Sequence, residues 1–298
     1  MCKVTIFTPT YNRLHTINRL YESLEKQTLK LFEWVIVDDG SKDGTYDYLL
    51  GKKNKATFKM KVIKQKNAGK HVAINKGVME AEGELFFIVD SDDYLSENAV
   101  EQILKIVESL PNKNDFAGVS GVRVNLSKKI IGNTFEGEVV DCTALERDMY
   151  NIIGDKAEVY FTDILKKYPF PVFEGENFLT ESVVWYRIAN AGYKIRWTNV
   201  PFYICDYQEG GLSDTTGKCS RCFKGFQLST KEILTYKELS LRRRFMQFLA
   251  YSSIAFKEKK DLKICAKEIK RSYIFITIIG RLGFYAYKIK QILKKGRK

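Results

Sequence analysis

Three carboxylates fall within four residues at Asp90, Asp92 and Asp93, directly after the apolar run 83–89. That run is typical of a buried strand. Carboxylates this close repel one another, and burying them costs several kcal/mol unless a positive group lies among them. A divalent cation held by two carboxylates and a diphosphate would supply that charge, and Mg²⁺ and Mn²⁺ prefer such oxygen ligands. For an isolated pair of acids, the alternative is a solvated loop that caps a helix.

Short strands and helices must position these acids. Apolar, β-prone segments at 4–9, 32–37, 61–64 and 83–89 predict strands, and the first of them is expected to end at Pro9, which lacks an N–H donor. The segments between them, at 14–24, 46–50 and 67–77, predict helices. This alternation predicts an α/β fold with a mostly parallel sheet that is flanked by helices on both faces.

Ligands of such sheets bind at the carboxyl ends of the strands. The polar segments 9–13, 38–44 and 90–93 all follow predicted strands and would meet at this edge. Three polar clusters on one edge indicate a binding site, which a single cluster would not.

These segments together resemble those of the family 2 glycosyltransferases, which have the GT-A fold. The motifs are Phe-Thr-Pro-Thr-Tyr-Asn-Arg at 7–13, Val-Asp-Asp-Gly-Ser-Lys-Asp-Gly-Thr at 37–45, the segment 67–77 and Val-Asp-Ser-Asp-Asp at 89–93. The resemblance covers roughly residues 3–213. It implies a nucleotide-sugar donor, usually a UDP-sugar, with Mn²⁺ or Mg²⁺ and inversion at the anomeric carbon.

The resemblance also implies a nucleoside pocket. Asp39 is similar to the acid that accepts the uracil N3–H, with Asp38 as the alternative. Thr8 and Tyr11 are similar to the residues that line and stack on the base. For Thr8, a core or hydroxyl-capping role is equally compatible with the sequence.

The resemblance further implies that the acids after the strand at 83–89 contact the donor. Asp90 resembles the acid that meets the ribose, and Asp92 the metal ligand, although some relatives use the position of Asp93. Lys70 lies where a basic residue approaches the nucleotide or diphosphate, and a solvated loop lysine is the alternative. His71 could join it.

An inverting transfer needs a general base beside the acceptor hydroxyl. In the family this base is an acid at the start of a downstream helix, which makes Glu181 the matching carboxylate. The common family pair is Glu-Asp, whereas this chain has Glu181-Ser182. Glu174 and Glu176 are the fallback candidates. The Gly-Gly-Leu-Ser segment at 210–213 resembles the end of the family's catalytic domain and could form a lid.

The 298 residues carry 49 Lys and Arg against 36 Asp and Glu, a net charge of +13. Residues 221–298 contain 21 Lys and Arg against 5 Asp and Glu, so this quarter has net +16 and the rest net −3. We therefore expect a catalytic domain at 1–215 and a basic helical region at 216–298. The basic, aromatic-rich end of the chain fits an anionic membrane surface, or packs on the protein or on a second copy of it.

These observations predict an inverting, metal-dependent glycosyltransferase that acts on a glycan or lipid-linked acceptor in cell-surface polysaccharide synthesis. The alternative is a catalytically weak nucleotide-sugar-binding scaffold at the membrane, suggested by the missing second acid after Glu181. Six cysteines without disulfide-framework spacing favour the cytoplasm, peripheral to the inner face of the cell membrane. The sequence has no recognisable nucleic-acid-binding motif, so we expect no nucleic-acid partner.

Overall fold

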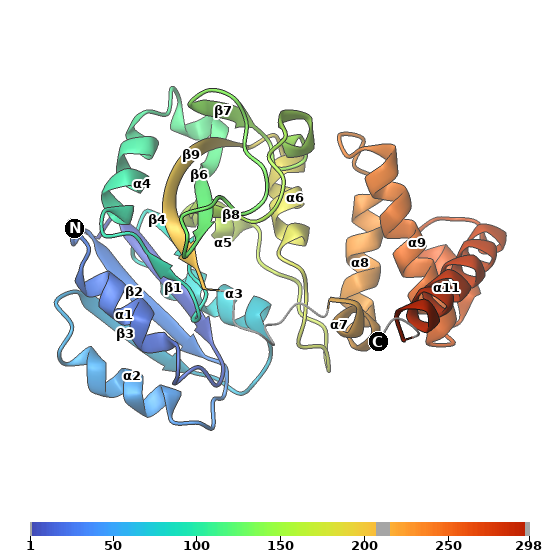
Figure 1. The fold of residues 1–298 in the computed structure, drawn as a ribbon, viewed down its shortest axis with the longest axis horizontal. Helices are drawn as coiled ribbons and strands as arrows, with labels where there is room; N and C mark the ends of the chain where they lie inside the picture. The colour runs from blue at the N-terminus through green and yellow to red at the C-terminus, as the bar shows by residue number, and fades with distance from the viewer. Residues whose placement is uncertain (1, 207–214, 296–298) are drawn as a thin grey trace. The chain divides into compact units, whose positions relative to one another are not determined.

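The computed structural model describes residues 2–206 and 215–295 and contains a nine-stranded mixed sheet (Figure 1). Eight strands follow the order β3-β2-β1-β4-β8-β6-β9-β5, and β7 pairs with β9. The strands are β1 (Val4–Thr10), β2 (Phe32–Asp38), β3 (Lys59–Lys64), β4 (Leu85–Ile88), β5 (Tyr94–Leu95), β6 (Phe116–Asn125), β7 (Val139–Cys142), β8 (Lys156–Phe161) and β9 (Lys194–Cys205).

Helices connect these strands and form the C-terminal region. They are α1 (Ile17–Glu25), α2 (Thr45–Lys53), α3 (Lys70–Glu80), α4 (Ala99–Glu108), α5 (Thr162–Lys167), α6 (Ser182–Asn190), α7 (Thr215–Arg221), α8 (Phe223–Ile233), α9 (Leu241–Lys257), α10 (Leu262–Glu268) and α11 (Tyr273–Lys295). Two short 3₁₀ turns lie at Lys113–Asp115 and Arg147–Tyr150.

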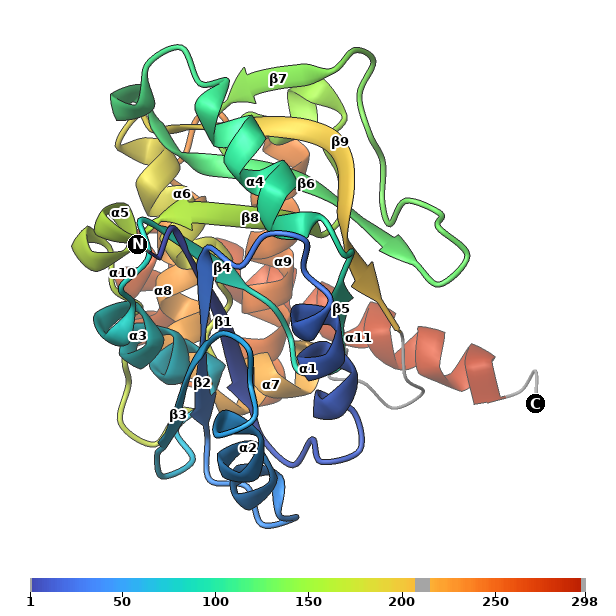
Figure 2. The same cartoon turned by 90° about the vertical axis from the view of Figure 1, so that its left-hand side faces the viewer.

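The parallel half of the sheet confirms the predicted α/β architecture. Strands β3, β2, β1 and β4 are parallel neighbours, and the other half of the sheet, which begins where β8 pairs antiparallel with β4, is mixed. Helices cover both faces, as Figures 1 and 2 show. Leu20 of α1, Leu49 of α2 and Ile103 of α4 belong to one buried cluster with Trp34 and Phe87 of the sheet.

Helix α3 packs on the opposite face, where Gly77 lies against the ring of Phe7. A Cβ atom at Gly77 would come within 2.2 Å of that ring, so the close approach requires glycine. This contact holds α3 close against β1.

The prediction that Pro9 ends the first strand is wrong. Pro9 pairs with Val37, and β1 continues to Thr10, whose carbonyl accepts the Asp39 N–H at 2.8 Å. The Phe7 carbonyl accepts the N–H of Val89, so alternate residues of β1 face β4, which ends at Ile88. The nitrogen of Pro9 therefore faces the side where the ladder has already ended, and the missing donor costs nothing.

Taken alone, the sequence predicts two further strands, at 193–197 and 201–205, but the structure has one continuous strand there, β9. Its pairing with β6 shifts register near Val122, and the polar residues between the two segments stabilise this irregularity. The Thr198 hydroxyl donates to the Ser120 carbonyl at 2.9 Å, and the Asn199 amide donates to the Phe135 carbonyl at 3.0 Å. Residues that resemble a turn in the sequence therefore occupy a β-bulge.

The chain divides into two compact units, residues 1–170 with 184–211 and residues 171–183 with 212–298. The second unit has its own buried cluster, which includes Phe248 and Tyr251 of α9 and Ile276 of α11. Because residues 171–183 group with the C-terminal helices, the boundary at residue 215 stays a prediction. Within the described ranges, each helix is too short or too polar to cross a membrane.

Candidate functional site at the carboxyl edge of the sheet

The loops after β1 and β2 are fastened to each other at the predicted edge of the sheet. The Asn12 N–H donates to Ser41 Oγ at 2.9 Å, and the Lys42 N–H donates to Asn12 Oδ1 at 2.9 Å. The Leu14 N–H donates to Asp43 Oδ2 at 3.0 Å. Burial alone would raise the pKa of Asp43, but hydrogen bonds from Thr45 and Leu14 hold it below its usual value. The two loops therefore form one preorganised surface.

The paired acids at the end of β2 have different surroundings. Asp38 Oδ1 accepts the N–H groups of Gly40 and Ser41, so this acid shapes its own turn. Asp39 holds the start of α3: its Oδ1 accepts the Ala68 N–H at 2.8 Å, and its Oδ2 accepts the Gly69 N–H at 2.9 Å. Since a carboxylate oxygen can accept two hydrogen bonds, Asp39 Oδ2 retains capacity for a base N–H.

Thr8 and Tyr11, which the sequence predicts to contact the nucleoside base, lie in different environments. Thr8 is fully buried, and its hydroxyl accepts the indole N–H of Trp34 at 2.9 Å, so its side chain meets the core. Tyr11 is 44% exposed on the loop after β1. Of the two, the ring of Tyr11 is accessible for stacking on a ligand.

Lys70 and Asp90, which the sequence assigns to the donor site, form an ion pair. The Lys70 ammonium lies 2.7 Å from Asp90 Oδ1, and the Arg123 guanidinium lies 3.7 Å from Asp90 Oδ2. Burial opposes ionisation of Asp90, but these two cations hold its pKa below the usual value. Asp90 is therefore a carboxylate at neutral pH. The adjacent His71 is buried.

Asp92 fits the role of a metal ligand better than its two neighbours do. Its side chain is half-buried, and its carboxylate has no hydrogen bond or ion pair with any residue that the structure describes. Within the same residues there is no group of three or more His, Cys, Asp or Glu side chains that could hold a metal. A hard cation here would take one ligand from Asp92 and the others from a diphosphate and water, a shell that suits Mg²⁺ or Mn²⁺.

Both carboxylate oxygens of Asp93 accept hydrogen bonds from residues at or directly after the end of β9. Its Oδ2 accepts the Tyr203 hydroxyl at 2.8 Å, and its Oδ1 accepts the Asp206 N–H at 3.2 Å. The Tyr203 hydroxyl in turn accepts the Asp90 N–H at 3.0 Å. Burial and the nearby charge of Asp90 raise the pKa of Asp93 to about 6. These bonds make Asp93 a structural acid in this geometry.

Replacing Asp93 with asparagine should change how stability depends on pH. A carboxyl whose pKa is raised in the folded state favours folding when it is protonated, and this contribution is lost as the pH rises toward about 6. In EDTA, the stability of Asp93→Asn relative to the parent protein should therefore increase by about 2–3 kcal/mol between pH 4 and pH 8. Urea unfolding at both pH values measures this difference. A pH-independent difference would contradict the raised pKa.

Arg19 of α1 is a residue of the site that sequence reasoning missed. Its guanidinium donates to the Asp92 carbonyl at 2.5 Å, forms an ion pair with Asp206 and lies 5.2 Å from the centre of the Tyr94 ring. It thus connects the acidic turn to the residue that follows β9. Sequence reasoning also missed Tyr203 and Asp206. More than a hundred residues separate them from Asp93, and no local sequence pattern indicates that they are in contact with it.

Replacing Arg19 with methionine should loosen the acidic turn. The variant loses two charge-assisted hydrogen bonds, and the partly exposed pair should cost about 1–2 kcal/mol of folding stability. UDP affinity in Mn²⁺ should fall roughly tenfold, because Asp92 is no longer held, and Arg19→Lys should restore part of it. Calorimetry of the three proteins makes the comparison. Unchanged affinity in Arg19→Met would show that Arg19 has no positioning role.

Glu181 belongs to the second unit, where it directly precedes α6. The Thr180 and Ser182 hydroxyls beside it are 3.0 Å apart. The fallback candidate Glu176 is engaged at the start of α8, where its two oxygens accept the N–H groups of Lys224 and Gly225 at 2.7 and 2.8 Å. Both oxygens of Glu176 are therefore used in capping α8, and Glu181 stays the predicted base. The predicted lid at 210–213 lies outside the described residues.

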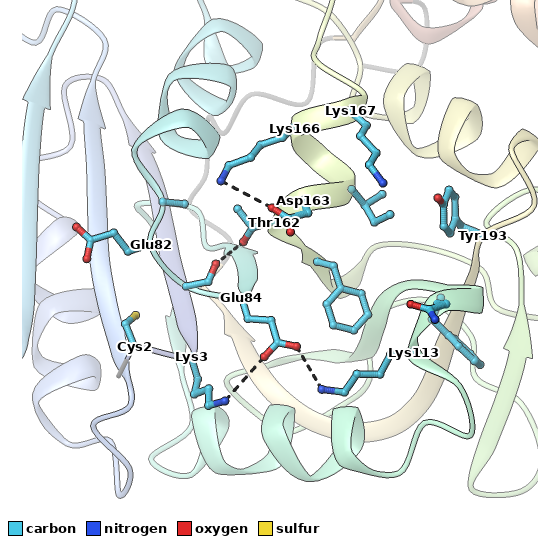
Figure 3. A pocket seen from close by; sticks show the side chains of 16 residues that line it. Cys2, Lys3, Glu82, Glu84, Lys113, Thr162, Asp163, Lys166, Lys167 and Tyr193 are labelled. Atoms are coloured by element: carbon cyan, nitrogen blue, oxygen red, sulfur yellow. Dashed lines mark hydrogen bonds and ion pairs between the residues drawn. The ribbon is translucent and has the colours of Figure 1, made fainter.

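A separate hollow of about 740 Å³ lies at the opposite edge of the sheet, beside the starts of β1, β4 and β6 (Figure 3). Glu84 lies there between Lys3, at 4.0 Å, and Lys113, at 3.2 Å. Lys166 and Asp163 of α5 form another ion pair at 3.8 Å. The acidic turn is at the other end of the strands, so this hollow is separate from the candidate site.

The family model described as glycosyl transferase family 2 matches residues 5–153. TarP of Staphylococcus aureus strain N315, a poly(ribitol-phosphate) β-N-acetylglucosaminyltransferase, is 30% identical over 149 residues, which are 47% of this chain and 45% of TarP. TarS of S. aureus strain MW2, of the same description, is 33% identical over 169 residues, 56% of this chain and 29% of TarS. The matches thus span less than half of these relatives.

Solved structures show the same fold. Residues 1–349 of S. aureus TarS in complex with UDP-GlcNAc superpose with a TM-score of 0.60 at 22% identity, covering 86% of this chain and 73% of that one. The mannosyltransferase PcManGT from Pyrobaculum calidifontis, in complex with GDP-Man and Mn²⁺, gives a TM-score of 0.50 at 16% identity, with coverage of 99% and 79%.

Proposed function

Because this chain belongs to glycosyl transferase family 2, we propose that it transfers a sugar from a UDP-sugar to a glycan or lipid-linked acceptor, with a divalent cation and inversion at the anomeric carbon. The observation that carries the proposal is the acidic turn. Asp90 and Asp93 are held by cations and hydrogen bonds, whereas the carboxylate of Asp92 is available for a ligand.

The donor assignment rests on the fastened loops and on the relatives. Asp39 retains an acceptor position for a base N–H, and the exposed ring of Tyr11 offers a stacking surface on the same edge. The likeness to TarS in complex with UDP-GlcNAc favours a uridine donor, whereas the likeness to PcManGT with GDP-Man makes GDP the alternative. We assign the nucleoside to Asp39 and Tyr11, and the ribose to Asp90 with Lys70 beside it.

The metal assignment rests on Asp92, with Mn²⁺ or Mg²⁺ as the cation. When bound, such an ion neutralises the charge that develops on the leaving diphosphate. Lys70 lies 2.7 Å from Asp90, and we assign it to the approach of the nucleotide or diphosphate. Asp93 contributes by holding the turn to Tyr203 and Asp206, and it is our second choice as a metal ligand.

Glu181 is the proposed general base. Inversion requires a carboxylate that removes the proton of the acceptor hydroxyl as that oxygen attacks the anomeric carbon, while UDP leaves on the other side. The position of Glu181, directly before α6, matches the family's pattern, and Glu176 is occupied by the N–H groups of α8. A catalytically weak scaffold protein is the competing proposal, because Ser182 replaces the family's second acid.

The proposal extends to the acceptor and the cellular location. The net charge of +16 in residues 221–298 supports peripheral attachment to the anionic inner face of the cell membrane. A lipid-linked acceptor of cell-surface polysaccharide synthesis would be present there.

Donor hydrolysis tests the proposed function without knowledge of the acceptor. The full chain should release UDP slowly from at least one member of a UDP-sugar panel in Mn²⁺ and not in EDTA. Proton NMR of the freed sugar reports its first anomeric form, which inversion predicts to be opposite to that of the donor. Release of UDP with the donor's configuration retained would overturn the inverting mechanism, and hydrolysis of GDP-sugars alone would overturn the uridine assignment.

A further inference from the structure

Helix α11 presents an uninterrupted apolar face to solvent. Six of its large apolar side chains are each more than half exposed: Ile274, Phe275, Ile278, Leu282, Tyr285 and Ile289. At 3.6 residues per turn they fall within an arc of about 100°, and we call them the α11 stripe. Exposed apolar residues scattered singly need no explanation, but a continuous stripe marks an interaction surface.

The other side of α11 is already used. Gly280 packs on α9, where an added Cβ would come within 2.5 Å of the Ser252 carbonyl oxygen, and one at Gly283 would come within 2.0 Å of Ser253 Oγ. Ile276 on this side is fully buried. This close glycine packing fixes the rotation of α11 in its own unit, so the stripe faces away from α9.

The charges beside the stripe identify its partner. Arg281 and Lys288 are exposed along one border of the stripe, and residues 221–298 carry net +16. Pairing two copies through the stripe would bring these like charges together, whereas an anionic lipid surface complements them. The described part of α11 is not long and apolar enough to span a bilayer. Its composition is typical of a helix that lies in the membrane–water interface.

We propose that the α11 stripe inserts into the headgroup region of an anionic membrane, with Arg281 and Lys288 on the lipid phosphates. The inference rests on the proposed function only in so far as that function places the enzyme at a membrane. It goes further by assigning attachment to an apolar face with defined residues, rather than to positive charge alone. Tyr285 suits this depth, because tyrosine rings concentrate at membrane–water interfaces, and Phe275 is an apolar residue of the kind that interfacial helices insert.

Vesicle co-sedimentation of the full chain tests the stripe. The parent protein should sediment with vesicles of equal parts phosphatidylglycerol and phosphatidylcholine. The double variant Ile278→Asn/Leu282→Asn should partition roughly 100-fold less, since each substitution removes about one tenfold factor of apolar transfer. The matched control is Ile264→Asn, which changes an equally exposed isoleucine of α10 and should bind like the parent. Arg281→Gln/Lys288→Gln should lose about 30-fold on the anionic vesicles alone.

Three results would overturn the proposal. The parent protein could fail to sediment, the stripe variant could bind as well as the parent, or light scattering without vesicles could show a dimer that the stripe variant dissociates. The last result would assign the stripe to a second copy. Calorimetric UDP binding, measured on the same proteins, separates this proposal from the proposed function. If the parent protein did not bind UDP, the donor site would be refuted, whereas vesicle binding would still report on the stripe.

Discussion

Glu181→Gln should lower kcat for sugar transfer about 10³-fold, while UDP binds with unchanged affinity. A glutamine has nearly the same shape as the glutamate but cannot take a proton from the acceptor hydroxyl, so the loss should fall on the chemical step. Transfer to a water or glycan acceptor is measured at saturating donor, and UDP affinity is measured by calorimetry on the same preparation.

Glu174→Gln tests the other fallback acid and is the comparison for this experiment. Glu174 is exposed on the same segment and should retain near-parental turnover. Glu176→Gln would be a poor control, because its carboxylate caps the start of α8 and its loss should reduce stability by about 1 kcal/mol. Full activity in Glu181→Gln would reject it as the base, and absence of turnover in the parent with every donor would favour the scaffold protein.

Asp92→Asn should lose most of the metal-dependent activity, again by about 10³-fold, with little change in stability. The carboxylate of Asp92 has no partner to lose among the described residues, so its removal should leave the fold intact and weaken the bound cation. Higher Mn²⁺ concentration should recover part of the rate. Turnover against Mn²⁺ concentration, together with thermal unfolding in EDTA, measures both effects.

Two further acids provide the comparison for Asp92. Asp163→Asn removes a highly exposed carboxylate of α5 and should change neither rate nor metal dependence. Asp93→Asn should act through stability and geometry, because Asp93 accepts hydrogen bonds from Tyr203 and Asp206. If Asp93→Asn raises the Mn²⁺ requirement and Asp92→Asn does not, the metal ligand is Asp93.

The sequence predicted the parallel half of the sheet because its signals are local. Apolar runs of four to seven residues alternate with helical spacing, and three of the strands end in polar residues. Pro9 and the segment 198–200 were misjudged, because the effect of a proline or a polar residue within a strand depends on what its neighbour strand does at that point. That information lies in the pairing, which one sequence does not contain.

The candidate site divides in the same way. Asp39, Lys70, Asp90 and Asp92 could be proposed from the sequence because they lie in short motifs next to predicted strands and helices. Arg19, Tyr203 and Asp206 were not found, because an arginine on a helix and a tyrosine in a strand are ordinary residues until the fold brings them to the acidic turn. The distinction between Asp92 as the proposed metal ligand and Asp93 as a structural acid likewise depends on their hydrogen bonds, which the sequence does not show.

Calorimetric titration of UDP into the full chain, in Mn²⁺ and then in EDTA, tests the central claim most directly. A metal-dependent donor site predicts saturable binding of one UDP per chain in Mn²⁺, at least tenfold weaker binding in EDTA, and weaker binding of GDP under both conditions. Equal UDP affinity with and without metal would contradict the role given to Asp92. Absence of binding under either condition would contradict the donor site itself.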